Sequence, residues 1–161
     1  FSLFLSKSVQ CILCVMELIK VEIEVSGQPR GKGRPRFTRN GHTYTDAKTK
    51  EYEKRIHAAA WQKMRELKLK PVGKFCHLEV IAFMEIPKSW SKVKQLEAEF
   101  GAIKPITKPD LDNIVKAAKD GISGLDGIIL DDKQVTSINA KKVYCHPERG
   151  PVLYICVSWT E

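Results

Sequence analysis

Alternating apolar and charged positions mark the first regular element of the chain. In IKVEIEV the apolar residues fall at positions 19, 21, 23 and 25, with charged residues between them. This alternation is typical of a strand that buries one face, so it predicts a strand over 18–25. Runs rich in apolar and β-branched residues predict three more strands, at 75–84, 134–144 and 151–159.

Two longer segments follow helical spacing instead. Residues 46–69 begin with Asp46, a suitable N-cap, and carry apolar residues at steps of three and four until the chain reaches Pro71. Residues 110–122 place Leu111, Ile114, Val115, Ala118 and Ile122 on one face of a helix. A shorter, basic helix is expected after Trp90, whose ring is more often packed in a core than exposed to a base.

These elements predict a fold of the α+β class, a single domain with a mixed sheet of about four strands and helices packed on it. The length of 161 residues and the apolar content of 43% suit one sizeable core. The order of the strands does not follow from the sequence. The chain opens on Phe1 and the amphipathic strand follows Met16, so residues 1–15 are interpreted as a non-native or upstream extension and 16–161 as the domain.

Charge and cysteine content narrow the class of partner. The excess of 27 Lys and Arg over 19 Asp and Glu gives a net charge of +8, which favours a polyanionic partner. The five cysteines are an odd number in a chain without a convincing signal peptide, which fits a reduced, cytoplasmic protein. The apolar opening segment is too short and too polar to span a bilayer, so no membrane partner is expected.

The segment SGQPRGKGRPRFTRNGHTYT is a glycine-loosened basic loop or loose hairpin, here called the basic arm (residues 26–45). It has no acidic residue, and its cations are Arg30, Lys32, Arg34, Arg36 and Arg39. Such an arm can lie along a phosphate backbone, although a solvated flexible loop would have the same composition. The density of positive charge favours phosphate contact.

The stretch TKPDLDNIVKAAKDGISGLDGIILDD holds six of the seven aspartates. Asp112, Lys116 and Asp120 recur at four-residue steps on the helix face opposite the apolar one, and a turn then leads to Asp131 and Asp132. Carboxylates from the helix and from the far side of the turn could converge on a hard cation such as Mg²⁺. A lysine one turn from Asp112 could offset phosphate charge.

Structural explanations exist for each aspartate taken alone. Asp110 could be a helix cap, Asp112 could pair with Lys116, and Asp131 with Asp132 could form a polar turn. An EF-hand loop is excluded, because Ile114 would occupy a ligand position and the required glycine is missing. Asp126, in SGLDG, is interpreted as a turn residue.

The run KPDLDNIVKAAKDGISG, with the following DDKQV and Lys141, resembles the RusA family of Holliday-junction resolvases. The resemblance covers most of residues 16–160 and includes GQPRGKGRPRF, which is typical of the branch found in phages and prophages of Gram-positive hosts. It implies a Mg²⁺-dependent endonuclease that works as a homodimer and nicks four-way DNA junctions symmetrically, in recombination and repair.

The resemblance also implies roles for individual residues. The essential carboxylates of the family fall on Asp110, Asp112 and Asp132, the expected metal ligands, and its essential lysine falls on Lys116. Asp131 is a possible additional ligand. Two other functions remain open at this point: a different metal-dependent nuclease acting on flaps or single strands, and a DNA-binding module without catalysis.

Overall fold

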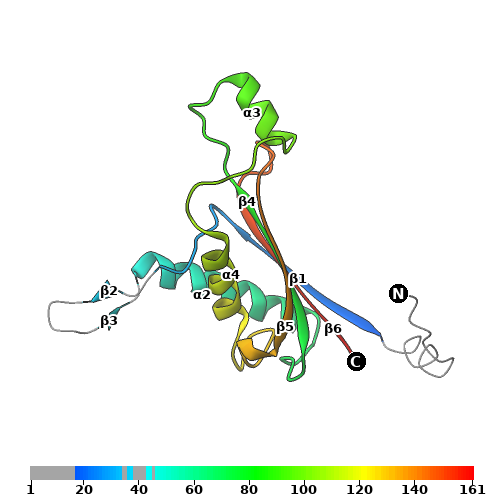
Figure 1. Ribbon diagram of the computed structural model, residues 1–161. Coiled ribbons are helices and arrows are strands. Elements are labelled where there is room, and N and C mark those ends of the chain that lie inside the picture. Colours follow the sequence, from blue (N-terminus) through cyan, green and yellow to red (C-terminus); the bar gives the residue numbers. More distant parts are fainter. Residues whose placement is uncertain (1–16, 34–35, 38–42, 45) are drawn as a thin grey trace, which may run out of the picture.

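Strand β6 (Val152–Thr160) is an inner strand of a four-stranded sheet in the computed structural model, which describes residues 17–33, 36–37, 43–44 and 46–161 (Figure 1). The strand order is β1-β6-β4-β5, with β1 at Leu18–Ser26, β4 at Cys76–Met84 and β5 at Val135–Tyr144. β6 runs antiparallel to both β1 and β4, whereas β5 runs parallel to β4. The predicted mixed sheet of an α+β domain is therefore confirmed.

One face of this sheet forms the core. The register aligns Val21 of β1 with Val157 of β6, which in turn faces Leu78 of β4. All three side chains are fully buried, as the alternation in β1 predicts for its own residue. The opposite face carries charged side chains from β1, such as Glu22 and Glu24.

Helices α2 (Ala47–Glu66) and α4 (Leu111–Ile122) cover the buried face (Figure 1). The bounds of α4 agree with the helix expected at 110–122, whereas α2 ends at Glu66, three residues before the end of the helix expected at 46–69. The buried side of α4 is shifted from the predicted apolar face, because Ala117 and Gly121 are buried whereas Leu111 and Val115 are only partly buried. Its buried residues are Ile114, Ala117, Ala118, Gly121 and Ile122.

Gly121 sets how closely α2 and α4 approach each other. A Cβ atom at this position would lie 2.6 Å from both Cβ and Cγ2 of Ile56. The two helix backbones therefore meet where one of them lacks a side chain, and His57 Nδ1 lies 3.2 Å from the Gly121 carbonyl oxygen at the same crossing. This close crossing fixes α4, and with it the acidic segment, against α2.

The remaining elements lie at the ends of the molecule. α3 (Lys92–Glu99) projects beyond β4, away from α2 and α4, and begins at the N-cap Ser91 (Figure 1). The preceding Trp90 packs edge-on against Tyr144, with ring centroids 5.5 Å apart. Its ring therefore has a packing role in the structure. The basic arm contributes a hairpin of β2 (Arg36–Phe37) and β3 (Thr43–Tyr44).

Some expectations fall on residues that the structure does not describe. The extension expected at 1–15 is one of them, and Cys11 and Cys14 lie within it. Within the described residues, none of the helices combines the length and apolar character that crossing a membrane requires. The described cysteines Cys76, Cys145 and Cys156 are buried free thiols.

Candidate active site

Helix α4 starts at the first two aspartates of the predicted site. Asp110 occupies the N-cap position, and its main-chain carbonyl accepts the first helical hydrogen bond from Ile114 N at 3.1 Å. Its side chain, however, makes no capping hydrogen bond. Asp112 lies in the first turn of α4, where the helix dipole favours a negative charge. Both side chains are exposed.

The ion pair that the spacing suggests between Asp112 and Lys116 is not formed. Among the described residues, no cation lies within 4.0 Å of the Asp112 carboxylate, and no carboxylate lies within that distance of the Lys116 ammonium. Capping and local pairing therefore do not account for Asp110, Asp112 or Lys116. These side chains are available to a ligand on the exposed side of α4.

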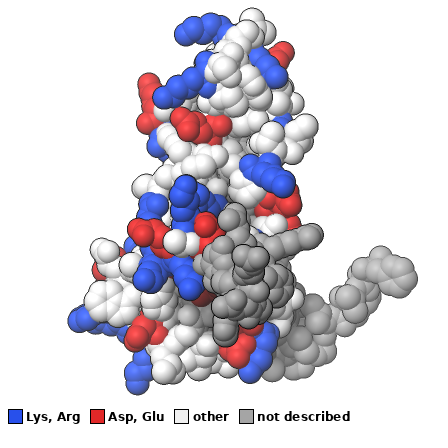
Figure 2. Space-filling view, turned by 90° about the vertical axis from the view of Figure 1, so that its left-hand side faces the viewer, with Lys and Arg blue, Asp and Glu red and all other residues white. Residues whose placement is uncertain are grey.

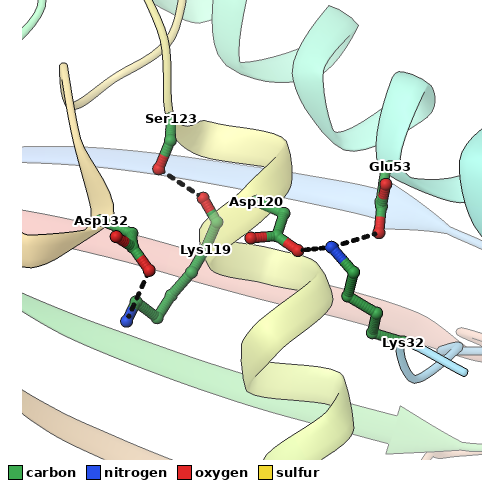
Figure 3. A network of polar contacts seen from close by, with 6 residues as sticks. All are labelled: Lys32, Glu53, Lys119, Asp120, Ser123 and Asp132. Carbon is green, nitrogen blue, oxygen red and sulfur yellow. Dashed lines mark hydrogen bonds and ion pairs between the residues drawn. The ribbon is translucent and has the colours of Figure 1, made fainter. Parts of the chain in front are cut away.

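Two other segments flank this exposed side of α4 (Figure 3). At about 100° per residue, Asp112 and Lys116 form a ridge, with Asp120 turned to one side of it and Lys119 to the other. Asp120 contacts Lys32 of the basic arm, whereas Lys119 Nζ lies 3.2 Å from Asp132 Oδ2. The arm and the segment after the turn are thus brought to opposite sides of the same ridge.

Asp131 and Asp132 have different roles in the structure. Asp131 caps the short 3-10 helix η1 (Asp132–Gln134), accepting a hydrogen bond from Lys133 N at 3.0 Å, and Gln134 Oε1 accepts one from Asp131 N at 2.8 Å. The Lys133 backbone N–H is the main reason why the pKa of Asp131 is lowered. Asp132 makes no such cap and points to Lys119, while Asp126 is an exposed residue of the turn before η1.

The basic arm enters the site beside the start of α4. Lys32 N donates a hydrogen bond to the Asn113 carbonyl oxygen at 2.8 Å. A Cβ atom at Gly31 would lie 2.8 Å from Asn113 Cβ and 3.0 Å from Pro109 Cβ, so only glycine allows this approach. Between arm and helix lies a groove of about 830 Å³ that is lined by Arg30, Lys32 and Asp110, among others.

Of the five cations predicted to contact DNA, the structure describes the side chains of two. Arg30 is exposed, and Lys32 is partly buried against α2 and α4. Arg34 and Arg39 lie outside the described residues, and only the backbone of Arg36 is described, within β2. In Figure 2, the cations of the described residues on this side of the molecule lie among carboxylates.

Three residues that the sequence did not single out also support the site. Lys142 of β5 donates hydrogen bonds to the main-chain oxygens of Thr107, at 2.6 Å, and Pro109, at 3.0 Å, which hold the segment leading into α4. Glu53 Oε1 of α2 lies 3.6 Å from Lys32 Nζ, and the Asn113 carbonyl oxygen accepts the hydrogen bond from the backbone of the arm. Asn113 stands inside DLDN, a position that could have drawn attention to it, whereas no local pattern marks Glu53 or Lys142.

The carboxylates of the candidate site partly suit the Mg²⁺ ion that the sequence predicts. Within the described parts of the chain, no three Asp, Glu, His or Cys side chains lie close enough together to enclose a metal ion. Mg²⁺ is often held by one or two carboxylates, with water and substrate phosphate completing its shell. Asp110 and Asp112 match that form of site, whereas Asp132 is engaged by Lys119.

Comparison with known proteins identifies the family. Residues 26–153 match the family described as endodeoxyribonuclease RusA. The chain is also 36% identical over 144 residues to the uncharacterized protein YqaN of Bacillus subtilis strain 168, an alignment that covers 86% of this chain and 97% of YqaN. The match spans the basic arm, α4 and η1, and hence every described residue of the candidate site. The chain therefore belongs to the RusA family of endodeoxyribonucleases.

Proposed function

We propose that this protein is a Mg²⁺-dependent resolvase that acts as a homodimer and cuts four-way DNA junctions by paired symmetric nicks, in DNA recombination and repair. The observation that carries the proposal is the start of α4, where Asp110 and Asp112 are exposed. Neither side chain forms a capping hydrogen bond or an ion pair within the described residues. Uncompensated carboxylates beside a basic arm suit a metal that is shared with a phosphate.

In the proposed mechanism, Asp110 and Asp112 would hold the cation, and Asp132 would be a third ligand in place of its contact with Lys119. A bound Mg²⁺ supplies Lewis-acid polarisation of the phosphodiester and a lowered pKa of the attacking water. Lys116, one turn after Asp112, donates to the phosphate oxygen on which negative charge develops. Arg30 and the rest of the basic arm hold the DNA backbone beside the start of α4.

Branched DNA is the proposed substrate because of the family, and phosphate contacts would recognise the shape of the junction rather than its bases. A two-fold symmetric dimer would present two copies of α4 to the two strands that are cut in a four-way junction. The three buried free thiols fit a protein that works in the reducing cytoplasm.

Cleavage assays test the proposal directly. Labelled four-way junctions, flaps and linear duplexes would each be incubated with wild-type protein in Mg²⁺ or in EDTA. Each junction should receive paired nicks, and only when Mg²⁺ is present. Asp112→Asn should lower the cleavage rate by at least about a hundredfold, because it removes a metal ligand. Asp126→Asn is the matched control, since Asp126 is an exposed aspartate of the same acidic segment that lies in a turn.

Each alternative has its own outcome in this assay. Faster cutting of flaps than of junctions would favour a different structure-specific nuclease. Junction binding without any cutting would favour a DNA-binding module. Sedimentation analysis of the protein, alone and with a junction, tests the dimer. An 18.2 kDa species without DNA, together with a complex that holds one protein chain per junction, would contradict it.

A further inference from the structure

Lys32 belongs to the basic arm, yet its ammonium group is turned toward the protein. It contacts the carboxylate of Asp120 on α4 and lies 3.6 Å from Glu53 Oε1 on α2 (Figure 3). All three side chains are partly buried, with 28% of the Lys32 side chain exposed. The hydrogen bond with Asp120 is the main reason why the pKa of Lys32 is raised. The cation therefore joins the arm to both helices.

The backbone of the arm is fixed at the same point. Lys32 N donates to the Asn113 carbonyl oxygen, and Gly31 packs against Asn113 and Pro109 with no room for a side chain. A main-chain contact on one side of Lys32 and a side-chain contact on the other hold this residue in one place. The part of the arm before residue 34 is thus attached to the first turn of α4.

Arg30, two residues earlier, differs from Lys32 in each of these respects. It is exposed, and among the described residues no carboxylate lies within 4.0 Å of its guanidinium group. It also lines the groove that Asp110 borders. A phosphate that approached Lys32 would have to displace two carboxylates, whereas one that approached Arg30 would displace none of the described carboxylates.

We propose that Lys32 is a positioning residue: its ion pairs with Asp120 and Glu53 fasten the arm to α2 and α4, so that Arg30 is held beside Asp110, and Lys32 itself neutralises no phosphate. The part of this proposal that concerns DNA rests on the proposed function. The attachment itself is a property of the free protein and can be measured without DNA.

The salt dependence of junction binding separates a phosphate-binding residue from a positioning residue. Affinity would be measured in EDTA over a range of salt concentrations, because the slope of log K against log salt decreases in magnitude by about 0.9 for each phosphate that the protein no longer neutralises. Arg30→Gln should reduce the slope by about this amount. Lys32→Met should weaken binding roughly three- to tenfold at all salt concentrations and leave the slope unchanged.

Charge reversal supplies a second criterion. The double variant Lys32→Glu/Asp120→Lys restores the ion pair with opposite polarity and should recover most of the affinity that Lys32→Glu alone loses. A residue that binds phosphate could not be rescued in this way, because residue 32 would remain acidic. A reduced slope for Lys32→Met together with a failed rescue would overturn the proposal.

Hydrogen exchange tests the attachment in the absence of DNA. The Lys32 amide, which is bonded to Asn113, should exchange faster in Asp120→Asn than in wild type, while amides in the core of β6 keep their protection. Unchanged exchange at Lys32 would contradict the attachment even if junctions are bound. If wild-type protein binds no junction, the proposed function fails, but the exchange result still decides whether Lys32 fastens the arm.

Discussion

Lys119 Nζ lies 3.2 Å from Asp132 Oδ2, so a cation of α4 holds a carboxylate that the proposed mechanism uses as a metal ligand. The two residues come from segments separated by the turn that follows α4. This contact keeps Asp132 near α4. It also opposes metal binding, since Lys119 neutralises Asp132 and would repel a divalent cation.

Replacing Lys119 by Met is therefore expected to strengthen Mg²⁺ binding, roughly three- to tenfold, because it removes a competing positive charge. Isothermal titration calorimetry of the protein without DNA measures this directly. Asp132→Asn should weaken binding under the same conditions. Lys133→Met is the matched control, because Lys133 pairs with the capping residue Asp131 and should not affect affinity. Equal affinities for Lys119→Met and wild type would contradict the competition.

Gly127 is expected to be indispensable to the turn that delivers Asp132. A Cβ atom there would lie 2.2 Å from the Ile122 carbonyl oxygen, which accepts hydrogen bonds from Ile128 N and Ile129 N. Gly127→Ala should therefore lower the free energy of unfolding by about 1–3 kcal/mol or more. Urea denaturation measures the loss. Gly33→Ala, where the nearest atom would be 3.9 Å away, should leave stability unchanged, and equal stability of the two variants would be inconsistent with this packing.

Gly121 offers a test in which propensity and packing predict opposite signs. Alanine is favoured over glycine inside a helix by about 1 kcal/mol, so propensity alone predicts that Gly121→Ala raises the melting temperature. The short distance to Ile56 predicts that the melting temperature falls, because α2 and α4 would have to separate. We expect a fall. A rise in calorimetric scans would mean that the crossing relaxes at little cost.

Stability should decrease in mildly alkaline solution. Burial raises the pKa of the thiols of Cys76, Cys145 and Cys156 above their ordinary value of 9.0, and it raises the pKa of Tyr52 to about 12. The unfolded chain releases these protons at lower pH than the folded chain does, so the free energy of unfolding falls as pH rises above about 9. Lys32, with its raised pKa, adds nothing to this fall until about pH 10.5.

Urea denaturation at pH 7, 9 and 10 with a reducing agent present measures this dependence. Cys76→Ala removes one of the buried thiols, so its stability should decline less steeply over this range than that of wild type. A stability that is constant or rises between pH 7 and 10 would be incompatible with neutral, buried thiols in the folded state.

Local patterns in the sequence were sufficient to predict the helices and strands, and to predict which residues of the site lie on the exposed face of α4. The alternation in β1 and the periodicity of α4 depend on which face is buried, and both predicted bounds agree with the structure to within about two residues. The exposed positions of Asp112 and Lys116 follow from the same periodicity. The identity of the family likewise rested on residues close together in the sequence.

Contacts between distant segments could not be predicted from those local patterns. Lys32 meets Asp120, 88 residues later, only because the arm runs beside α4, and nothing near Lys32 in the sequence distinguishes it from Arg30. The pairing of Lys119 with Asp132 depends on the conformation of the turn between them. The glycines at 31, 121 and 127 each permit a close approach in the tertiary structure, which no local pattern in the sequence indicates.

The place of β6 in the sheet also bears on synthesis of the protein. β1 hydrogen-bonds to β6 alone among the strands of its sheet, from Leu18 opposite Thr160 to Ser26 opposite Val152. At about 5–20 residues per second, β1 leaves the ribosome many seconds before its partner exists, and it must remain an unpaired amphipathic strand, open to chaperones. A nascent chain thus exposes Asp110 and Asp112 before the sheet that positions them has closed.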